Sequence, residues 1–306
     1  MRHQLNGVIV LDKPADISSA KAVSEVKKLL NATKAGHAGT LDPFATGVLV
    51  CCLNQATRLA DFFLHGPKTY EAVLHLGIET DTQDATGSIV QQSRVPKLSG
   101  ADLEALFERH IGHQMQLPPV YAALKHQGTP LYKLARKGTP VQKPARPITI
   151  EGLRLMEFDL PEVVFEVTCS AGTYVRTLCA DLGRAVGCGG HLARLHRSAS
   201  SGFSIDEAVS LARLQSLAGE ARIEHLVPMA AALRKMPVFR AGPDIRRRVA
   251  HGQPLTLEHV PPSAYFTPDG APETDKVKVV DAEDNLMAVL QRAGDDGGYL
   301  YCCVFN

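Results

Sequence analysis

Residues 36–47 read GHAGTLDPFATG, the most unusual segment of the chain in composition. Three glycines and one proline within twelve residues predict a constrained loop, which leads into an apolar strand over residues 48–53. Because Pro43 disfavours helical backbone at the residue before it, Asp42 is held on extended backbone. A carboxylate on a rigid loop beside a strand is well placed for nucleophilic or acid–base chemistry. An aspartate that hydrogen-bonds its own turn gives the same pattern.

Strands and helices are mixed irregularly on both sides of this loop. The apolar run over residues 7–11 predicts a buried strand, and residues 70–76 alternate as in a half-buried strand. A further strand is predicted over residues 163–169. Because there is no regular βαβ alternation, the fold class is α+β rather than a doubly wound sheet. Helices are expected after the capping residues Ser18 or Ser19, Ser99, Thr173 and, in a capping box with Glu207, Ser204.

Length and composition favour a globular chain of two parts. The chain has 306 residues, 45% of them hydrophobic and 21% charged. Short β-rich runs separated by Gly, Pro and Asp follow Met236, so we divide the chain into residues 1–235 and a small β domain over residues 236–306. No stretch approaches the roughly 18 apolar residues of a membrane span, and no signal peptide is read at the N-terminus.

Cysteine usage and the absence of known motifs exclude several classes of site. Seven cysteines without a CxxC pair argue against a disulfide scaffold or zinc ribbon and fit a reducing cytoplasm. Phosphate-binding motifs of the GxxxxGK[ST] and GxGxxG types are absent, so a nucleotide cofactor has no support. His110 and His113 lack the context of a metal site. We therefore expect no cofactor and no metal.

The charge distribution allows a nucleic-acid partner. The net charge is only +1, but residues 109–150 and residues 182–205 contain several basic side chains and no acid. Such stretches suit a surface that follows phosphates, although ordinary solvated faces have the same composition. Six prolines between residues 117 and 147 interrupt any periodicity. This length without regular structure indicates a functional loop or lid.

Six blocks of sequence resemble the TruB family, the bacterial tRNA pseudouridine-55 synthases. The segment GHAGTLDPFATGVL resembles the catalytic-aspartate motif of that family, and all six blocks stand in the family's order. Asp16 stands where the family usually has Gly, and Ala122 replaces a usual Ser. The six blocks lie at residues 6–14, 36–49, 68–87, 118–138, 169–183 and 189–203.

The resemblance implies a fold and an activity. It implies a pseudouridine-synthase catalytic domain over residues 1–235, with a central mixed or antiparallel sheet flanked by helices and an RNA-binding insertion at about 117–147. Residues 236–306 then form a PUA-like RNA-binding β domain. The implied reaction flips a uridine at position 55 out of the TΨC loop of tRNA, breaks its N-glycosidic bond and reattaches the base through C5. A cytoplasmic monomer that needs no cofactor, metal or membrane is implied.

The resemblance also assigns residues. Asp42 matches the essential aspartate and Arg176 the arginine that pairs with it, keeping the carboxylate ionised and aimed. Tyr70 matches a tyrosine that stacks on the target base and shuttles a proton near C5. From the residues alone, the favoured readings are a surface arginine for Arg176 and a core tyrosine for Tyr70. Contacts to substrate are implied for His37, which enters the RNA loop, for the apolar Leu195, for Tyr174 and Lys13, and for the phosphate-binding Lys125, Lys133, Arg136 and Lys137.

Three other readings compete with this one. The first is the related guide-RNA-dependent synthase of the dyskerin type, against which the full insertion and the short termini argue. The second is a non-catalytic tRNA binder or folding chaperone that uses the same surface. The third is a nucleosidase or glycosidase, which normally needs a second carboxylate near Asp42, and none lies close in the sequence.

Overall fold

The computed structural model describes residues 5–268, 274–294 and 297–305. Residues 1–4, over which no signal peptide was read, lie outside the described ranges. The strands are β1 (Gly7–Lys13), β2 (Ala35–His37), β3 (Thr46–Leu53), β4 (Lys68–Leu76), β5 (Ile78–Thr80), β6 (Ile89–Gln92), β7 (Gly112–Gln116), β8 (Lys125–His126), β9 (Thr129–Pro130), β10 (Arg146–Asp159), β11 (Glu162–Cys169), β12 (Gly190–Ser200), β13 (Phe203–Ser204), β14 (Val209–Ser210), β15 (Leu226–Pro228), β16 (Val238–Arg240), β17 (Leu255–Thr256), β18 (Lys276–Val280), β19 (Leu286–Ala293) and β20 (Gly298–Val304).

The helices are short and lie between the strands along the chain. They are α1 (Ser19–Leu29), α2 (Ala60–Leu64), α3 (Gly100–Glu108), α4 (Leu131–Arg136), α5 (Val175–Val186), α6 (Leu211–Ser216), α7 (Gly219–Ile223), α8 (Met229–Ala232) and α9 (Pro243–Ala250), with 3-10 turns η1 (Asn54–Leu59), η2 (Ile205–Glu207) and η3 (Pro262–Ala264). Among these helices of the described ranges, none has the length and apolar character that crossing a membrane requires.

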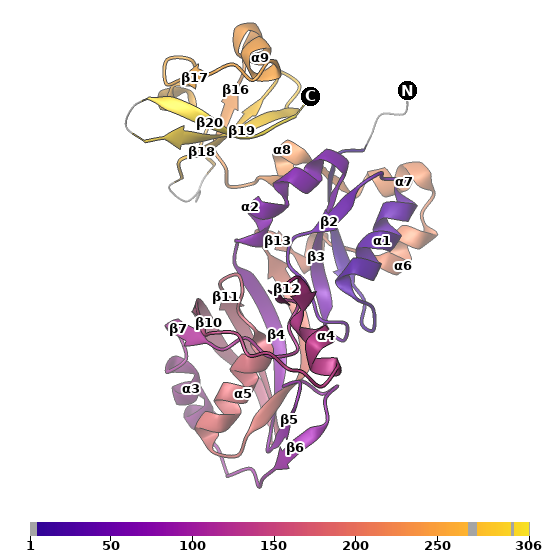
Figure 1. Ribbon diagram of the computed structural model, residues 1–306, viewed down its shortest axis with the longest axis vertical. Coiled ribbons are helices and arrows are strands. Elements are labelled where there is room, and N and C mark those ends of the chain that lie inside the picture. The colour runs from indigo at the N-terminus through magenta and orange to yellow at the C-terminus, as the bar shows by residue number, and fades with distance from the viewer. Residues whose placement is uncertain (1–4, 269–273, 295–296, 306) are drawn as a thin grey trace.

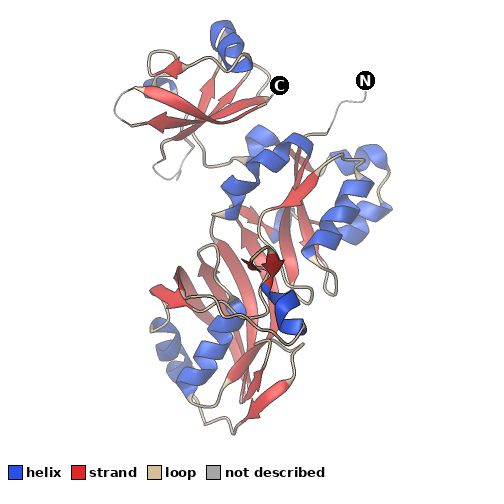
Figure 2. Cartoon of the chain, viewed as in Figure 1, coloured by secondary structure: helices blue, strands red, loops and turns tan. Residues whose placement is uncertain are grey.

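A large mixed sheet forms the spine of the molecule (Figures 1 and 2). In the described ranges it has the order β14-β1-β3-β12-β4-β11-β10-β7, with β2, β13 and β15 paired to its sides. Most neighbours are antiparallel, but β3 and β12 run parallel, as do β1 and β14. A second sheet of order β16-β18-β19-β20-β17 forms the C-terminal part, at the top of Figure 1. The predicted α+β class, with a central mixed sheet, flanking helices and a C-terminal β domain, is confirmed.

Alternation along β1 and β3 explains why this half of the sheet is buried on both faces. Ile9 and Leu11 pack toward α1 and α6, whereas Val8 and Val10 pack on the opposite face with η1, α2 and α8. Continuous apolar runs are typical of such doubly covered strands. The cluster that contains Val8 and Val10 also includes five residues of the C-terminal part: Val280, Leu286, Val289, Cys303 and Phe305.

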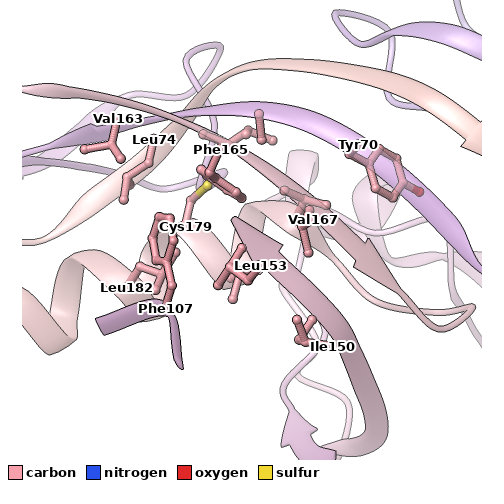
Figure 3. Packing of buried hydrophobic residues seen from close by; sticks show 14 of the residues in the cluster. Tyr70, Leu74, Phe107, Ile150, Leu153, Val163, Phe165, Val167, Cys179 and Leu182 are labelled. Atoms are coloured by element: carbon pink, nitrogen blue, oxygen red, sulfur yellow. The ribbon is translucent and has the colours of Figure 1, made fainter. Parts of the chain in front are cut away.

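The other half of the main sheet is covered by α3 and α5. Phe107 of α3 and Leu182 of α5 pack on Phe165 of β11, as Figure 3 shows, and the cluster continues to Ile150 of β10. Tyr70 lies at one end of this cluster, apart from the other labelled side chains (Figure 3). Tyr70 is also one of the residues that line a cavity.

Two of the predicted helix caps are confirmed and one is wrong. Ser18 caps α1, and Ser99 forms a capping box with Asp102 at α3. Thr173 does not cap α5, which begins after Tyr174 without a side-chain cap from that residue. Gln116 of β7 holds the residue at which the helix begins, because its Oε1 accepts from the Tyr174 backbone N–H at 2.8 Å.

The predicted last helix is also shorter than expected. Ser204 and Glu207 form the capping box, but it opens only the single turn η2. The chain leaves the helix because Val209 pairs with Leu11 of β1 as the parallel strand β14. The residues after η2 thus pair with the edge of the sheet and do not continue the helix.

The proline-rich segment 117–147 is not a bare loop. It carries the β8–β9 hairpin and α4, which lie in front of the main sheet in Figure 1. The departure at Asp16 leaves its turn intact, because Asp16 adopts the left-handed region with φ +65°. Glycine adopts this conformation without cost, and aspartate is among the residues that tolerate it.

Candidate active site

A cavity of about 510 Å³ opens at the end of the α3–α5 half of the sheet. Its walls come from the loop before β3, from β4 and β12, from the turn before α5 and from the insertion. Five of the residues predicted from the sequence line it: Asp42, Tyr70, Tyr174, Arg176 and Leu195. These residues are separated by up to about 150 positions in the chain, so the sheet pairing is what assembles them.

Asp42 and Arg176 form the predicted ion pair. Arg176 Nε lies 2.9 Å from Asp42 Oδ2, and Arg176 Nη2 lies 3.5 Å from Oδ1. The arginine is buried, whereas 35% of the aspartate side chain is exposed to the cavity. Two-point contact by a planar guanidinium fixes the direction of the carboxylate. Asp42 is therefore held with one side facing the space that a substrate would occupy.

Further contacts hold the arginine itself. Arg176 Nη1 donates to the carbonyl of Thr82 at 3.0 Å and lies 3.6 Å from Asp84 Oδ2. Its Nη2 donates to the carbonyl of Tyr121, in the insertion, at 3.1 Å. Asp84 is buried and accepts from the backbone N–H of Thr86 at 2.9 Å. Sequence reasoning missed Asp84, because the Thr80–Asp84 segment reads only as a turn.

The pKa of the Asp42 carboxyl shifts in the direction opposite to the one expected for a simple ion pair. Burial raises the pKa of the Asp42 carboxyl, the Arg176 guanidinium opposes this change, and Asp84 adds to it. The net direction is upward. A carboxylate whose pKa is raised is a stronger base when ionised, which suits a group that acts on a proton or an electrophilic carbon.

Tyr70 also lines the cavity. It lies on β4, is buried with 8% of its surface exposed, and has Val167 of β11 as its register partner. Burial raises the pKa of the phenol, and the nearby Arg197 guanidinium opposes that rise. Leu195 of β12 is half-buried and lines the same cavity. An aromatic ring and an aliphatic side chain here suit the face of a planar base.

Tyr174 is fixed at the entrance by contacts on both sides. Its backbone carbonyl accepts from Gln116 Nε2 at 3.1 Å, and the guanidinium carbon of Arg146 lies 4.7 Å from its ring centroid. Arg146 also donates to the carbonyl of Gly172. The ring is thereby held at the rim of the cavity, at the start of α5.

Lys13 is placed differently from the other predicted contact residues. It is fully buried, and its ammonium donates to the carbonyls of Pro14, Ile17 and Pro43 at 2.8, 2.8 and 3.1 Å. An ammonium has three donors, so all of them are engaged. Burial lowers the pKa of Lys13 to about 8. The structure thus gives Lys13 a supporting position beneath the Asp42 loop in place of a substrate contact.

The remaining predicted contacts lie outside the cavity. His37 is half-buried on β2 and is not among the residues that line the cavity, and burial lowers its pKa. The four predicted phosphate contacts are exposed on the insertion, within or beside β8 and α4: Lys125, Lys133, Arg136 and Lys137. Their exposure leaves the positive charges accessible to a polyanion.

Two buried cations that the sequence analysis did not predict as site residues, Lys68 and Arg197, also line the cavity. Arg197 appears in the sequence only as one of several basic residues in an acid-free stretch. Lys68 reads as the first residue of a strand, yet its ammonium is directed at the carbonyls of Phe63, Leu64 and Gly66. The order Lys-Thr-Tyr before an alternating strand was the only available signal for Lys68.

Comparison with known proteins agrees with this geometry. The description "TruB family pseudouridylate synthase (N terminal domain)" matches residues 27–175, and "tRNA pseudouridylate synthase B C-terminal domain" matches residues 176–235. A tRNA pseudouridine synthase B of Burkholderia mallei (strain NCTC 10247) is 41% identical over 290 residues, which are 95% of this chain and 94% of that protein. One of Francisella tularensis subsp. novicida (strain U112) is 45% identical over 239 residues, 78% of this chain and 79% of that protein.

Two solved structures with the same architecture are chains of complexes named for Cbf5 and Nop10. A chain of a Cbf5-Nop10-Gar1 complex has a TM-score of 0.74 at 25% identity and covers 99% of this chain and 84% of its own length. A chain of the archaeal box H/ACA sRNP Nop10-Cbf5 complex has a TM-score of 0.72, also at 25% identity, with 99% and 86% covered. The Burkholderia mallei protein and this chain are 41% identical over nearly the full length of both, and the two family descriptions together match residues 27–235. This chain therefore belongs to the TruB family of pseudouridine synthases.

Proposed function

We propose that this protein converts the uridine at position 55, in the TΨC loop of tRNA, to pseudouridine. The observation that carries the proposal is the Asp42–Arg176 pair, which lines the same cavity as Tyr70. The 41–45% identity to proteins named tRNA pseudouridine synthase B supports tRNA as the substrate. We further propose that the protein acts as a cytoplasmic monomer.

The cavity requires the target base to leave its stack. A uridine inside an RNA loop cannot be surrounded by Asp42, Tyr70 and Leu195 unless it is flipped out, at a cost of a few kcal/mol. In the proposed reaction the bond between C1′ and N1 breaks, the base turns, and C5 bonds to C1′. The hydrogen on C5 then leaves as a proton, and N1 gains one. No atom is added to the substrate, and nothing is oxidised.

Each cavity residue has a proposed part in these steps. Asp42 acts on the ribose or the base, and Arg176 aims its carboxylate. Tyr70 stacks on the base and accepts the C5 proton, while Leu195 makes an apolar contact to the base. Tyr174 contacts the nucleotide at the rim, and His37 enters the RNA loop in place of the flipped base. Their placement around one cavity, or beside it for His37, supports these parts.

The insertion is the proposed clamp on the RNA backbone. Its exposed cations are suited to phosphate contacts, which position the RNA without reading its sequence. The carbonyl of Tyr121 accepts from Arg176, so the insertion is connected directly to the catalytic pair. We propose the division at residues 235 and 236 for the two domains, with the C-terminal β domain as a second, PUA-like RNA-binding unit.

Neutralising Lys133, Arg136 and Lys137 together is expected to weaken tRNA binding and to flatten its dependence on salt. Each lost phosphate contact reduces the log–log salt slope by about one. Titration of tRNA binding at several salt concentrations measures the slope. The matched control removes three exposed lysines of α1, Lys21, Lys27 and Lys28. An unchanged slope in the insertion variant would show that the insertion does not clamp RNA.

Chelation of divalent metals is expected to leave the chemical step unaffected. EDTA should slow the reaction on full-length tRNA only through tRNA folding, and a preformed short stem-loop should escape this inhibition. The measurement compares rates on the two substrates with and without EDTA. Loss of activity on the stem-loop that one specific metal restores would contradict this prediction.

The proposed function is tested by the product of a guide-free reaction. The purified chain is incubated with a T-stem-loop transcript labelled in its uridines, and the nucleosides are analysed. Pseudouridine supports the proposal, free uracil would identify a nucleosidase, and no change would favour a non-catalytic binder. The 25% identity to the Cbf5 complexes makes a guide-RNA-dependent enzyme the second candidate. Activity without any guide RNA excludes that candidate.

A further inference from the structure

Arg197 is a buried cation without an acidic partner. It lies on β12 with 1% of its surface exposed and is the largest of the fully buried side chains. Within the described ranges it forms no ion pair, in contrast to Arg176. Removing a charge from water is costly unless another interaction compensates for it. A buried, unpaired guanidinium beside a cavity therefore calls for a reason in the chemistry of that cavity.

The sheet register places Arg197 on β12 between two strands: β3, which follows the Asp42 loop, and β4, which carries Tyr70. Its backbone partners are Tyr70 on β4 and Gly47 on β3, so Arg197 and Tyr70 are direct neighbours across two strands. The guanidinium carbon lies 6.0 Å from the centroid of the Tyr70 ring. Gly47 has φ +99°, and a Cβ there would lie 2.3 Å from the Arg197 carbonyl oxygen. The close approach of β3 to β12 at this point thus requires glycine.

The same guanidinium also fixes both ends of the Asp42 loop. Its Nη2 donates to the carbonyl of Gly39, before Asp42, at 3.1 Å. Its Nε donates to the carbonyl of Val48, after Asp42, at 2.6 Å. One side chain therefore connects the loop that carries the carboxylate to the strand that carries the phenol.

Arg197 is the cation that opposes the effect of burial on Tyr70. Burial raises the pKa of the phenol, and Arg197 lowers it. The neighbouring Cys169 thiol has a pKa raised to about 11, so it is neutral near pH 7. The other ionisable groups that face Tyr70 or line the same cavity are Asp42, His65, Lys68, Arg146, Tyr174 and Arg176.

We propose that Arg197 is a positioning residue that makes Tyr70 competent as the proton acceptor, by placing a permanent positive charge beside its phenol oxygen. This inference rests on the proposed role of Tyr70. In the step concerned, C5 carries both C1′ and its hydrogen, and the Tyr70 phenolate takes that hydrogen as a proton. The electron pair of the C–H bond forms the C5–C6 double bond, and the N1–C6 π pair moves to N1. N1 then takes a proton from water, and the phenol returns its proton to water.

A double-mutant cycle separates this role from a structural one. Single-turnover rates are measured for the parent, Arg197→Gln, Tyr70→Phe and the double variant. Arg197→Gln is expected to be about tenfold slower near pH 7. The pH at which its rate rises is expected to be about one pH unit or more above that of the parent. The shift is upward because loss of the positive charge disfavours the phenolate. In the Tyr70→Phe background the same substitution is expected to cost less than about threefold.

Conservative and control variants keep the test decisive. Arg197→Lys retains a charge and is expected to be intermediate in rate, with a loss that also disappears in the Tyr70→Phe background. If Arg197→Gln does not fold, Arg197→Lys takes its place in the double-mutant cycle. Arg154→Gln removes an exposed arginine that pairs with Glu166 and should match the parent.

The outcomes of the cycle are distinct. Equal losses in both Tyr70 backgrounds, or an unshifted pH profile, would overturn the proposal and leave Arg197 as a structural residue. A Tyr70→Phe rate close to the parental rate would instead overturn the proposed role of Tyr70, and the inference with it. Coupled losses with a shifted profile support both.

Discussion

Asp42→Asn is expected to abolish pseudouridine formation while tRNA binding stays within about threefold of the parental value. Asp42 is the one carboxylate among the described residues that line the cavity, so no other acid there can replace it. Asparagine keeps the shape of the side chain and part of its hydrogen bonding to Arg176. It can act neither as a nucleophile nor as a base. The rate is measured with enzyme in excess over a labelled stem-loop, and binding is measured separately on the same RNA.

The control for this variant is Asp181→Asn, on the surface of α5, where the aspartate forms an exposed pair with Arg184. That variant should match the parent in both assays. A rate of pseudouridine formation by Asp42→Asn within tenfold of the parental rate would show that Asp42 is not the catalytic carboxylate. Loss of binding in parallel with activity would instead indicate that the Asp42 loop mainly holds RNA.

Tyr70→Phe is the second variant for which we expect a large effect, because stacking and proton transfer predict different rates. If Tyr70 only stacks, phenylalanine keeps the aromatic face, which supplies the ~1–3 kcal/mol of base stacking, and most of the rate remains. If the phenol accepts the C5 proton, the loss is about 100-fold or more. We expect the larger loss with normal tRNA binding. The new bond to C5 forces that carbon to lose its proton, and a neutral uracil provides no base.

Single-turnover conditions are necessary for this variant, because release of modified tRNA would otherwise hide the chemical step. A near-parental single-turnover rate would reduce Tyr70 to a stacking platform and leave the proton acceptor unidentified. The raised pKa of the Tyr70 phenol gives a further expectation. If the phenolate is the base, the parental rate rises with pH until it passes that pKa, and the Tyr70→Phe rate does not follow this rise.

Local sequence patterns predicted the parts of the fold that depend on local interactions. Ser18 and Ser99 cap helices as expected, and the apolar run of β1 is buried on both faces. Where a distant segment competes, the local pattern fails. Thr173 does not cap α5, because the helix begins one residue later than predicted, after Tyr174, whose backbone N–H binds Gln116, 58 positions earlier in the chain. The capping box at Ser204 opens only one turn because β1 recruits the residues that follow it.

The site divides in the same way. Asp42, Tyr70 and Arg176 lie in segments that resemble motifs of the TruB family, and this resemblance identified Tyr70 and Arg176, which the residues alone did not. Asp84 and Arg197 acquire their positions only through the fold. Asp84 approaches Arg176 across 92 positions of the chain, and Arg197 meets Tyr70 only because β12 inserts between β3 and β4. Lys13 shows the converse, since a lysine in a recognisable motif proves to be buried on three carbonyls.

The most direct test of the account is position-resolved detection of pseudouridine in an unmodified, full-length tRNA transcript. The purified chain is added without guide RNA, and every uridine of the transcript is examined before and after the reaction. The account predicts one new pseudouridine, at position 55 in the TΨC loop, with the parent and none with Asp42→Asn. Modification at another position, at several positions, or equally by both proteins would contradict it.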